Sequence, residues 1–140
     1  MATLMGTPYE RGKSDVIVSR RIDAPVAEGL VVADAGDGKV KAYTGAETPF
    51  GIMGQNEIVG CSVVTAGLKV YAQADEGCTP TVGGAVYVTT AGKVTHDSSG
   101  TKLVNAEFAE KACKENGVID NISAKSMTQK CVAINFVGGL

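Results

Sequence analysis

The stretch CTPTVGGAVYVTTAGKVTHDSSG, residues 78–100, decides the fold class of this chain. Residues 85–90 are rich in β-branched side chains and include a tyrosine, and residues 93–95 resume this pattern after an Ala-Gly pair. Such residues favour strands, while glycine accepts the positive φ that a tight reversal of the chain requires. The stretch therefore predicts a β-hairpin in which Gly84 and Gly92 occupy the turns.

A weaker copy of this pattern, PVAEGLVVADAGDGKVKAY, lies upstream at residues 25–43. The distance from the proline to the glycine of the Gly-Lys-Val triplet is 13 positions from Pro25 to Gly38 and 12 positions from Pro80 to Gly92. Either an internal duplication or two independent hairpins with glycine turns accounts for the match. Both alternatives predict a second hairpin over residues 30–44.

The composition of the chain indicates a mainly β fold. Val and Ile together number 25 against 5 Leu, and the 140 residues are enough for one domain with a substantial core. Helical domains favour Leu, whereas Val, Ile and Thr suit the half-buried pleated surface of a sheet. We expect residues 16–140 to form a single β domain and residues 1–15 to form a flexible N-terminal arm.

Charge and hydropathy exclude several classes of partner. The net charge of −2 gives no electrostatic footprint for nucleic acid, and no apolar run approaches the roughly 18 residues that cross a bilayer. The first residues, MATLMGTPYERGK, lack the apolar core of a signal peptide. We therefore expect no nucleic-acid partner, no membrane partner and synthesis in the cytoplasm.

Further strands are predicted along the chain from alternating or continuous apolar runs. They cover residues 15–20, 50–53, 58–65, 68–72 and 131–137, with a break at residues 66–67 and a polar loop over residues 117–130. Residues 103–117 are ambiguous. Asn105 and Gly117 suit the two ends of a short helix near 106–115, whereas the alternation of Val104, Ala106 and Phe108 suits a strand.

The residues that carry chemistry in enzymes do not form a spaced constellation in this sequence. His96-Asp97-Ser98-Ser99 contains the residue types of a catalytic triad, but consecutive residues cannot adopt triad geometry, so a polar loop is the better interpretation. The four cysteines, Cys61, Cys78, Cys113 and Cys131, include no Cys-x-x-Cys pair and are expected to be reduced and structural. We predict no enzymatic activity, no cofactor and no metal.

Four segments carry a resemblance to a known family. They are Gly67-Leu68-Lys69-Val70, VGGAVYV at residues 82–88, Gly-Lys-Val-Thr at residues 92–95 and the final CVAINFVGGL. In this order and spacing the chain resembles a tailed-bacteriophage capsid cement protein, also called a head decoration protein. The resemblance covers about residues 16–140, although segment 109–130 is longer than the family pattern leads us to expect.

The resemblance implies a small antiparallel β-barrel or β-sandwich, described as β-tulip-like. It also implies a structural virion protein that binds the outer surface of the expanded phage head and bridges subunits of the major capsid protein. Such a protein is made and assembled in the host cytoplasm, acts as a homo-oligomer with a trimer favoured, and is not an enzyme. The alternative is a non-catalytic β-type module that binds a ligand or a partner.

The candidate contacts with the capsid or with neighbouring subunits are Pro8, Tyr9, Arg11, Lys13, Arg20 and Arg21. Tyr and Arg are frequent anchors of interfaces, and proline reduces the ordering cost of a segment that docks. The segment 1–15 would then be a docking arm, with a plain disordered tail as the alternative. The Arg pair at 20–21 is the only pair of adjacent basic residues in the chain.

Overall fold

The computed structural model describes residues 16–57, 60–115, 117–119, 125–127 and 129–136. The strands are β1 (Val16–Ile22), β2 (Val31–Gly36), β3 (Lys39–Ala42), β4 (Pro49–Glu57), β5 (Gly60–Gln73), β6 (Ala85–Val88), β7 (Val94–Thr95), β8 (Thr101–Phe108), β9 (Gly117–Ile119), β10 (Lys125–Met127) and β11 (Cys131–Phe136). These residues contain no helix, so the predicted mainly β fold is confirmed. The predicted arm, residues 1–15, lies outside the described residues.

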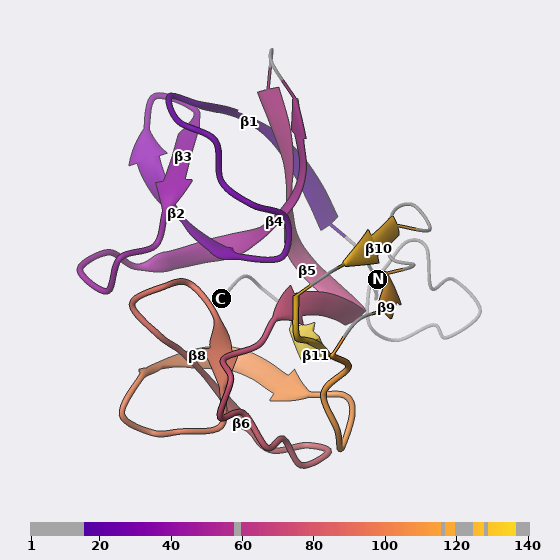
Figure 1. Ribbon diagram of the computed structural model, residues 1–140. Helices are drawn as coiled ribbons and strands as arrows, with labels where there is room; N and C mark the ends of the chain where they lie inside the picture. The colour runs from indigo at the N-terminus through magenta and orange to yellow at the C-terminus, as the bar shows by residue number, and fades with distance from the viewer. Residues whose placement is uncertain (1–15, 58–59, 116, 120–124, 128, 137–140) are drawn as a thin grey trace, which may run out of the picture.

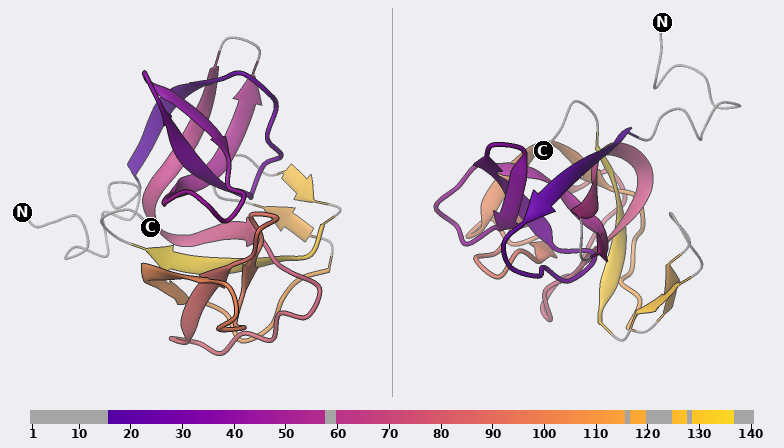
Figure 2. Two further views of the ribbon diagram at one scale, coloured as in Figure 1. Left: turned by 90° about the vertical axis from the view of Figure 1, so that its left-hand side faces the viewer. Right: turned by 90° about the horizontal axis from the view of Figure 1, so that it is seen from above.

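Nine of the described strands form one mostly antiparallel sheet in the order β1-β3-β2-β4-β5-β11-β8-β6-β7. An additional pairing of β1 with β5 closes the first five strands of this order into a ring. A bridge between Ala74, just after β5, and Val94 of β7 brings the far end of the sheet back towards β5. Figures 1 and 2 show the outcome as two lobes, one above the other, with β5 passing between them.

The two lobes have matching strand orders. The order is β3-β2-β4-β5 in the first lobe and β7-β6-β8-β11 in the second, and every neighbouring pair in both is antiparallel. The final strand of each set, β5 in one and β11 in the other, pairs with its counterpart. This shared topology favours an internal duplication over two independent hairpins as the origin of the sequence match.

The strand β5 is the element that both lobes share. Its first part pairs with β1 and β4, with Val63 opposite both Val18 and Met53. Its second part pairs with β11, with Val70 opposite Ile134. The prediction of two strands broken at residues 66–67 is therefore wrong. The strand continues through these residues because β11 pairs with β5 from the point where the pairing with β1 and β4 ends.

A local distortion marks the change of partner within β5. Lys69 has a φ of 53°, a left-handed conformation that is unusual for a residue with a side chain. Its backbone N–H donates to Asn135 Oδ1 at 2.8 Å, and the register of β11 against β5 shifts between Ile134 and Phe136. The side chain of Asn135 thus satisfies the backbone donor where the ladder is irregular.

Lys69→Gly should raise the free energy of unfolding by about 0.5–1 kcal/mol, because glycine adopts positive φ without the steric cost of a Cβ. Lys69→Ala is the matched control, since it removes the same long side chain and keeps the Cβ. Denaturant midpoints of the two variants and the wild type give the comparison. Equal midpoints for the glycine and alanine variants would show that this backbone conformation costs nothing.

Alternation along the strands divides the core into two clusters. Val31, Ile52 and Val64 face the larger cluster, whereas their chain neighbours Val32, Met53 and Val63 face the smaller one. The larger cluster also contains the buried apolar residues of the second lobe, including Val86, Val88, Leu103, Phe108, Val132, Ile134 and Phe136. One face of the first lobe thus packs against the second lobe, while its other face forms the interior of the ring.

The hairpin predicted from residues 78–100 is confirmed. β6 and β7 pair with Tyr87 opposite Thr95, and Gly92 at the turn has a φ of 79°. The positive φ expected at Gly84 is found instead at Gly83, with a φ of 79°. Gly84 is required for space, because a Cβ there would lie 2.6 Å from Thr81 Oγ1.

The upstream hairpin is confirmed as well, with β2 paired to β3 through the turn at Asp37 and Gly38. Other boundaries differ from the prediction. β4 reaches Glu57 and is longer than the expected 50–53. In place of the expected loop over 117–130, β9 and β10 pair with each other in a separate two-stranded sheet, at the side of the two lobes in Figures 1 and 2.

The short helix considered near 106–115 is absent, and the alternative prediction of a strand is correct. β8 ends at Phe108, and residues 109–115 continue as an irregular segment that contacts β11. Lys114 and Cys131 exchange two backbone hydrogen bonds of 2.8 Å. Pairing of β8 with both β6 and β11 outweighs the helix-favouring composition, because burying Leu103 and Phe108 requires the strand.

Candidate functional site

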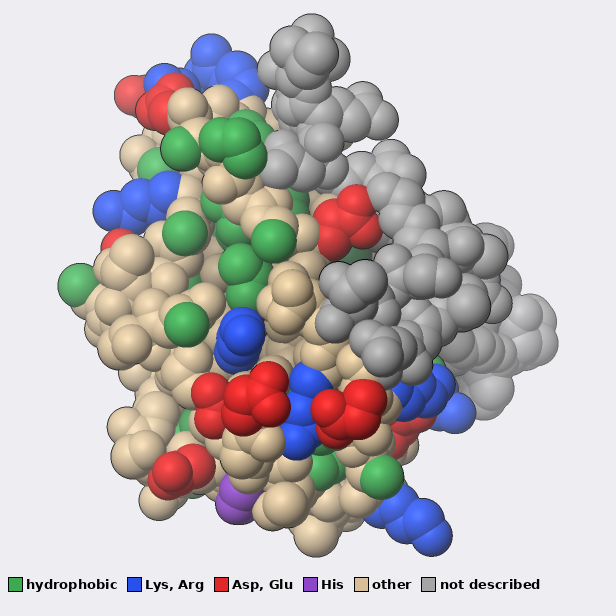
Figure 3. Space-filling view, viewed as in Figure 1, with side chains coloured by type: hydrophobic (Ala, Val, Ile, Leu, Met, Phe, Trp, Pro, Cys, Tyr) green, Lys and Arg blue, Asp and Glu red, His purple; other side chains and the backbone are tan. Residues whose placement is uncertain are grey.

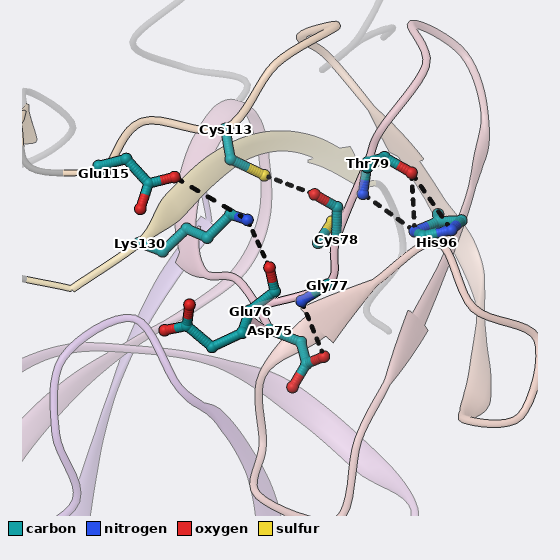
Figure 4. A network of polar contacts seen from close by, with 9 residues as sticks. All are labelled: Asp75, Glu76, Gly77, Cys78, Thr79, His96, Cys113, Glu115 and Lys130. Carbon is teal, nitrogen blue, oxygen red and sulfur yellow. Dashed lines mark hydrogen bonds and ion pairs between the residues drawn. The ribbon is translucent and has the colours of Figure 1, made fainter.

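A network of polar and thiol groups lies in the second lobe, where three loops meet the start of β11. We call this set the Cys78 junction, and Figure 4 shows its members: Asp75, Glu76, Gly77, Cys78, Thr79, His96, Cys113, Glu115 and Lys130. The turn after β5 is shaped by its own backbone, since the N–H of Cys78 donates to the carbonyl of Asp75 at 3.0 Å. Asp75 in turn donates its N–H to the carbonyl of Val94 at 2.9 Å, which places the turn against β7.

Lys130 joins two of these loops. Its Nζ donates to the carbonyl of Glu76 at 2.7 Å and lies 3.9 Å from Glu115 Oε2. The Lys130 side chain is only 14% exposed, whereas that of Glu115 is 73% exposed. The partner that holds the ammonium in place is therefore the backbone carbonyl, and the exposed ion pair adds little because water screens it.

His96 contacts the same turn from the end of β7. Its Nδ1 accepts the backbone N–H of Thr79 at 3.0 Å, and the Thr79 hydroxyl lies 3.4 and 3.3 Å from the two ring nitrogens. The Asp97 carboxylate accepts the backbone N–H of Ser99 at 3.0 Å, and this hydrogen bond lowers the pKa of Asp97. These contacts hold turns together, as expected for a polar loop.

The state and the burial of the four cysteines are consistent with the structural role predicted for them. All four thiols are free, and Cys61, Cys78 and Cys131 are buried, whereas Cys113 is half-buried. Burial raises the pKa of each thiol, and that of Cys78 rises to about 12 through burial together with the neighbouring Cys113. The Cys113 thiol donates to the carbonyl of Cys78 at 3.6 Å.

A second polar cluster, which the sequence did not reveal, covers the outer side of β5. Lys114 Nζ donates to the Tyr71 hydroxyl and lies 4.6 Å from the centroid of the Tyr71 ring. Glu110 Oε1 accepts the N–H of Ala133 at 3.1 Å, and its Oε2 lies 3.7 Å from Lys114 Nζ. The i, i+4 spacing of Glu110 and Lys114 is typical of a helical pair, but here both side chains attach segment 109–115 to the sheet.

The predicted contact residues fall into two groups. Pro8, Tyr9, Arg11 and Lys13 lie outside the described residues. Arg20 and Arg21 lie on β1, where successive side chains point to opposite faces. Their side chains therefore do not form one cluster.

The two arginines have separate contacts. The Arg20 guanidinium lies 5.2 Å from the centroid of the Phe50 ring, and that of Arg21 donates to the carbonyl of Asp37 in the turn between β2 and β3. Figure 3 shows basic, acidic and apolar side chains interspersed over the viewed face, without one large field of a single sign.

The loop that joins β3 to β4 gives a pH-dependent contribution to stability. Glu47 accepts the backbone N–H of Thr44 at 2.8 Å and hydrogen bonds from its hydroxyl, and it lies 3.3 Å from Lys41 Nζ. These contacts lower the pKa of Glu47 from 4.5 to about 2, the backbone hydrogen bond from Thr44 being the largest cause. Because the folded pKa is the lower one, the stabilisation is complete above the unfolded pKa and is lost as the pH falls towards the folded pKa.

We therefore expect Glu47→Gln to be less stable than the wild type at pH 6 and to approach it as the pH falls from about 4.5 to 2. Thermal unfolding of both proteins across this range measures the effect. Glu107→Gln is a suitable control, because Glu107 is an exposed acidic residue on β8. A difference between Glu47→Gln and wild type that stays constant down to pH 2 would contradict the assignment.

Among the described residues, no group of three or more His, Cys, Asp or Glu side chains could hold a metal ion. That part of the chain also has no helix of the length and hydropathy needed to span a bilayer. Comparison of the whole sequence with protein-family models and with curated proteins finds no match to either.

Proposed function

We propose that this protein is a structural capsid cement, or head decoration, protein of a tailed bacteriophage. In this role it binds the outer surface of the expanded head, bridges subunits of the major capsid protein and has no enzymatic activity. It assembles on the head in the host cytoplasm as a homo-oligomer, with a trimer favoured. The proposal combines the resemblance of four sequence segments with their arrangement in space.

The observation that carries the proposal is the convergence of these four segments on one lobe. Segment 67–70 lies in the second part of β5, and its Val70 is opposite Ile134 of β11, which belongs to the final segment. Segments 82–88 and 92–95 include β6 and β7, which pair with each other. Segments that are scattered over half of the sequence thus form one packed unit, which supports a shared fold as the source of the resemblance.

The surface of the same lobe offers apolar groups to a partner. Val82 and Val104 are 66% and 72% exposed, which is high for large apolar side chains. The polar groups around His96, by contrast, are engaged in turns. A protein that acts through its surface fits this distribution better than a catalyst does.

Co-sedimentation with expanded capsids tests the proposal. We expect saturable binding at a fixed number of copies per capsid, and no binding to the unexpanded form. Val104→Asp should weaken the binding, while Asn105→Asp, at the neighbouring exposed position on the same strand, serves as a control for added charge. Absence of binding to expanded capsids, with specific capture of an unrelated ligand, would favour the alternative of a non-catalytic binding module.

A further inference from the structure

Cys78 and Cys113 meet within the Cys78 junction although 35 positions separate them in the chain. The Cys113 thiol donates to the carbonyl oxygen of Cys78 at 3.6 Å, so the Cys113 sulfur lies beside the backbone of Cys78. Figure 4 shows the Cys113 thiol pointing from segment 109–115 to the carbonyl oxygen of Cys78 in the turn after β5. Cys113 also packs against the core cluster to which Cys78 belongs.

We propose that Cys78 and Cys113 are a redox-convertible pair that closes into an intramolecular disulfide when the protein meets a low-molecular-weight disulfide such as oxidised glutathione. This inference is independent of the proposed function, since it rests on the two thiols alone. In its reduced form the pair is the structural contact described above. In its oxidised form the pair is a disulfide cross-link, here called the clasp, between the turn after β5 and the segment that precedes β9.

The exposure of the two thiols determines the order of the steps. Cys113 is half-buried and reaches solvent, so its thiolate attacks one sulfur of the oxidant and releases one glutathione thiolate. The Cys78 thiol, buried beside it, then loses its proton and attacks Cys113 Sγ, which forms the protein disulfide and releases the second glutathione thiolate. Two protein thiols are oxidised, one small disulfide is reduced to two thiols, and the protons pass to those thiols or to water.

The surroundings of the pair keep it reduced until an oxidant is present. Burial raises the pKa of both thiols, so little thiolate exists at neutral pH and attack is slow. The ammonium of Lys130 opposes this effect on both thiols, whereas Glu110 and Glu115 reinforce it on Cys113. We therefore expect the protein to be fully reduced when isolated from a reducing cytoplasm, and its closure by the oxidant to accelerate as the pH rises.

Intact-mass measurement on the full chain tests the proposal directly. The native protein is incubated with oxidised glutathione, then unfolded and treated with a thiol-alkylating reagent before the mass is recorded. We expect two alkylated cysteines, Cys61 and Cys131, and one cross-link between Cys78 and Cys113 that dithiothreitol reverses. Without the oxidant, all four cysteines should be alkylated.

Three outcomes would overturn the proposal: a stable glutathione adduct on Cys113 without closure, a cross-link between Cys113 and Cys131, or alkylation of all four cysteines after oxidation. Matched variants make the result specific. Cys61→Ala and Cys131→Ala should still form the cross-link, whereas Cys78→Ser and Cys113→Ser should not.

The clasp should also be visible in thermal unfolding. Closing a loop of this length restricts the unfolded chain, so the oxidised wild type should melt roughly 5–10 °C above the reduced form. Cys113→Ser should show no shift on the same treatment. A cross-linked protein with an unchanged or lower Tm would show that closure strains the junction, and would contradict the view that the pair is arranged for it.

Discussion

Replacing Gly92 with valine is expected to lower the free energy of unfolding by about 3 kcal/mol. Gly92 has a φ of 79°, which a β-branched residue adopts only with strain. A Cβ at this position would also lie 3.2 Å from the carbonyl oxygen of Val31 and 3.7 Å from the Cβ of Leu30. The backbone N–H of Val31 donates to the carbonyl of Gly92 at 2.9 Å, so the valine would disturb the contact between the two lobes.

Gly38→Val provides a matched control for this prediction. Gly38 has a similar φ of 74° at the equivalent turn of the first hairpin, but a Cβ there would meet nothing within 4 Å. We expect this variant to lose only the conformational contribution, about 1–2 kcal/mol. Equal losses for the two variants in chemical denaturation would show that the turn of the second hairpin does not contact the first lobe tightly.

Deletion of residues 2–13 is expected to weaken binding to expanded capsids at least about tenfold, or roughly 1.4 kcal/mol, and to leave the Tm unchanged. The reason for the stable Tm is structural. The first described strand begins at Val16, which pairs with Ala66 in the middle of β5, so every described contact survives the deletion. The loss of binding follows from the Pro8, Tyr9, Arg11 and Lys13 side chains, whose types are suited to anchoring an interface.

A second variant distinguishes the contribution of the side chains in residues 2–13 to capsid binding from the contribution of the segment's length. Replacing residues 2–13 by a Gly/Ser sequence of the same length should weaken binding as much as the deletion does. Binding isotherms at limiting protein concentration give both numbers. Equal occupancy of the capsid by full-length, deleted and Gly/Ser proteins would refute the docking arm while leaving the proposed cement function open.

Sequence patterns within short segments predicted the elements that depend mainly on the conformational preferences of neighbouring residues. The two hairpins follow from β-branched residues around glycine turns, and β11 follows from the alternation in CVAINF. The burial of Cys61, Cys78 and Cys131 follows from a thiol's apolar character. The preference for β structure over helix follows from the excess of Val and Ile over Leu.

Long-range pairing decided the features that the sequence did not predict. β5 is continuous because β11 supplies partners where β1 and β4 end, and no residue within β5 encodes that exchange. The positive φ of Lys69 depends on the side chain of Asn135, which is 66 positions away. Segment 103–117 has a helical composition, yet the burial of Phe108 between its neighbouring strands fixes the strand.

The sequence predicted which kinds of residue form the candidate site, but it did not predict which of them contact one another. The polar loop at His96 is expected from the residues, whereas its contact with Thr79 depends on how the turn after β5 reaches β7. The meeting of Cys78 with Cys113 has no signature in their spacing, because both lie in loops whose paths the sheet determines. The adjacency of Arg20 and Arg21 suggests a pair, but a strand directs neighbouring side chains to opposite faces.

The most direct test of the proposed function is the stability of expanded capsids with and without this protein. Many copies bound to a symmetric lattice each add a modest interface, so their contributions to the shell accumulate. We expect saturated capsids to withstand a rise in temperature or a fall in ionic strength that ruptures bare capsids, with the protection appearing as the binding sites fill. Rupture of saturated and bare capsids under the same conditions would contradict a cement function.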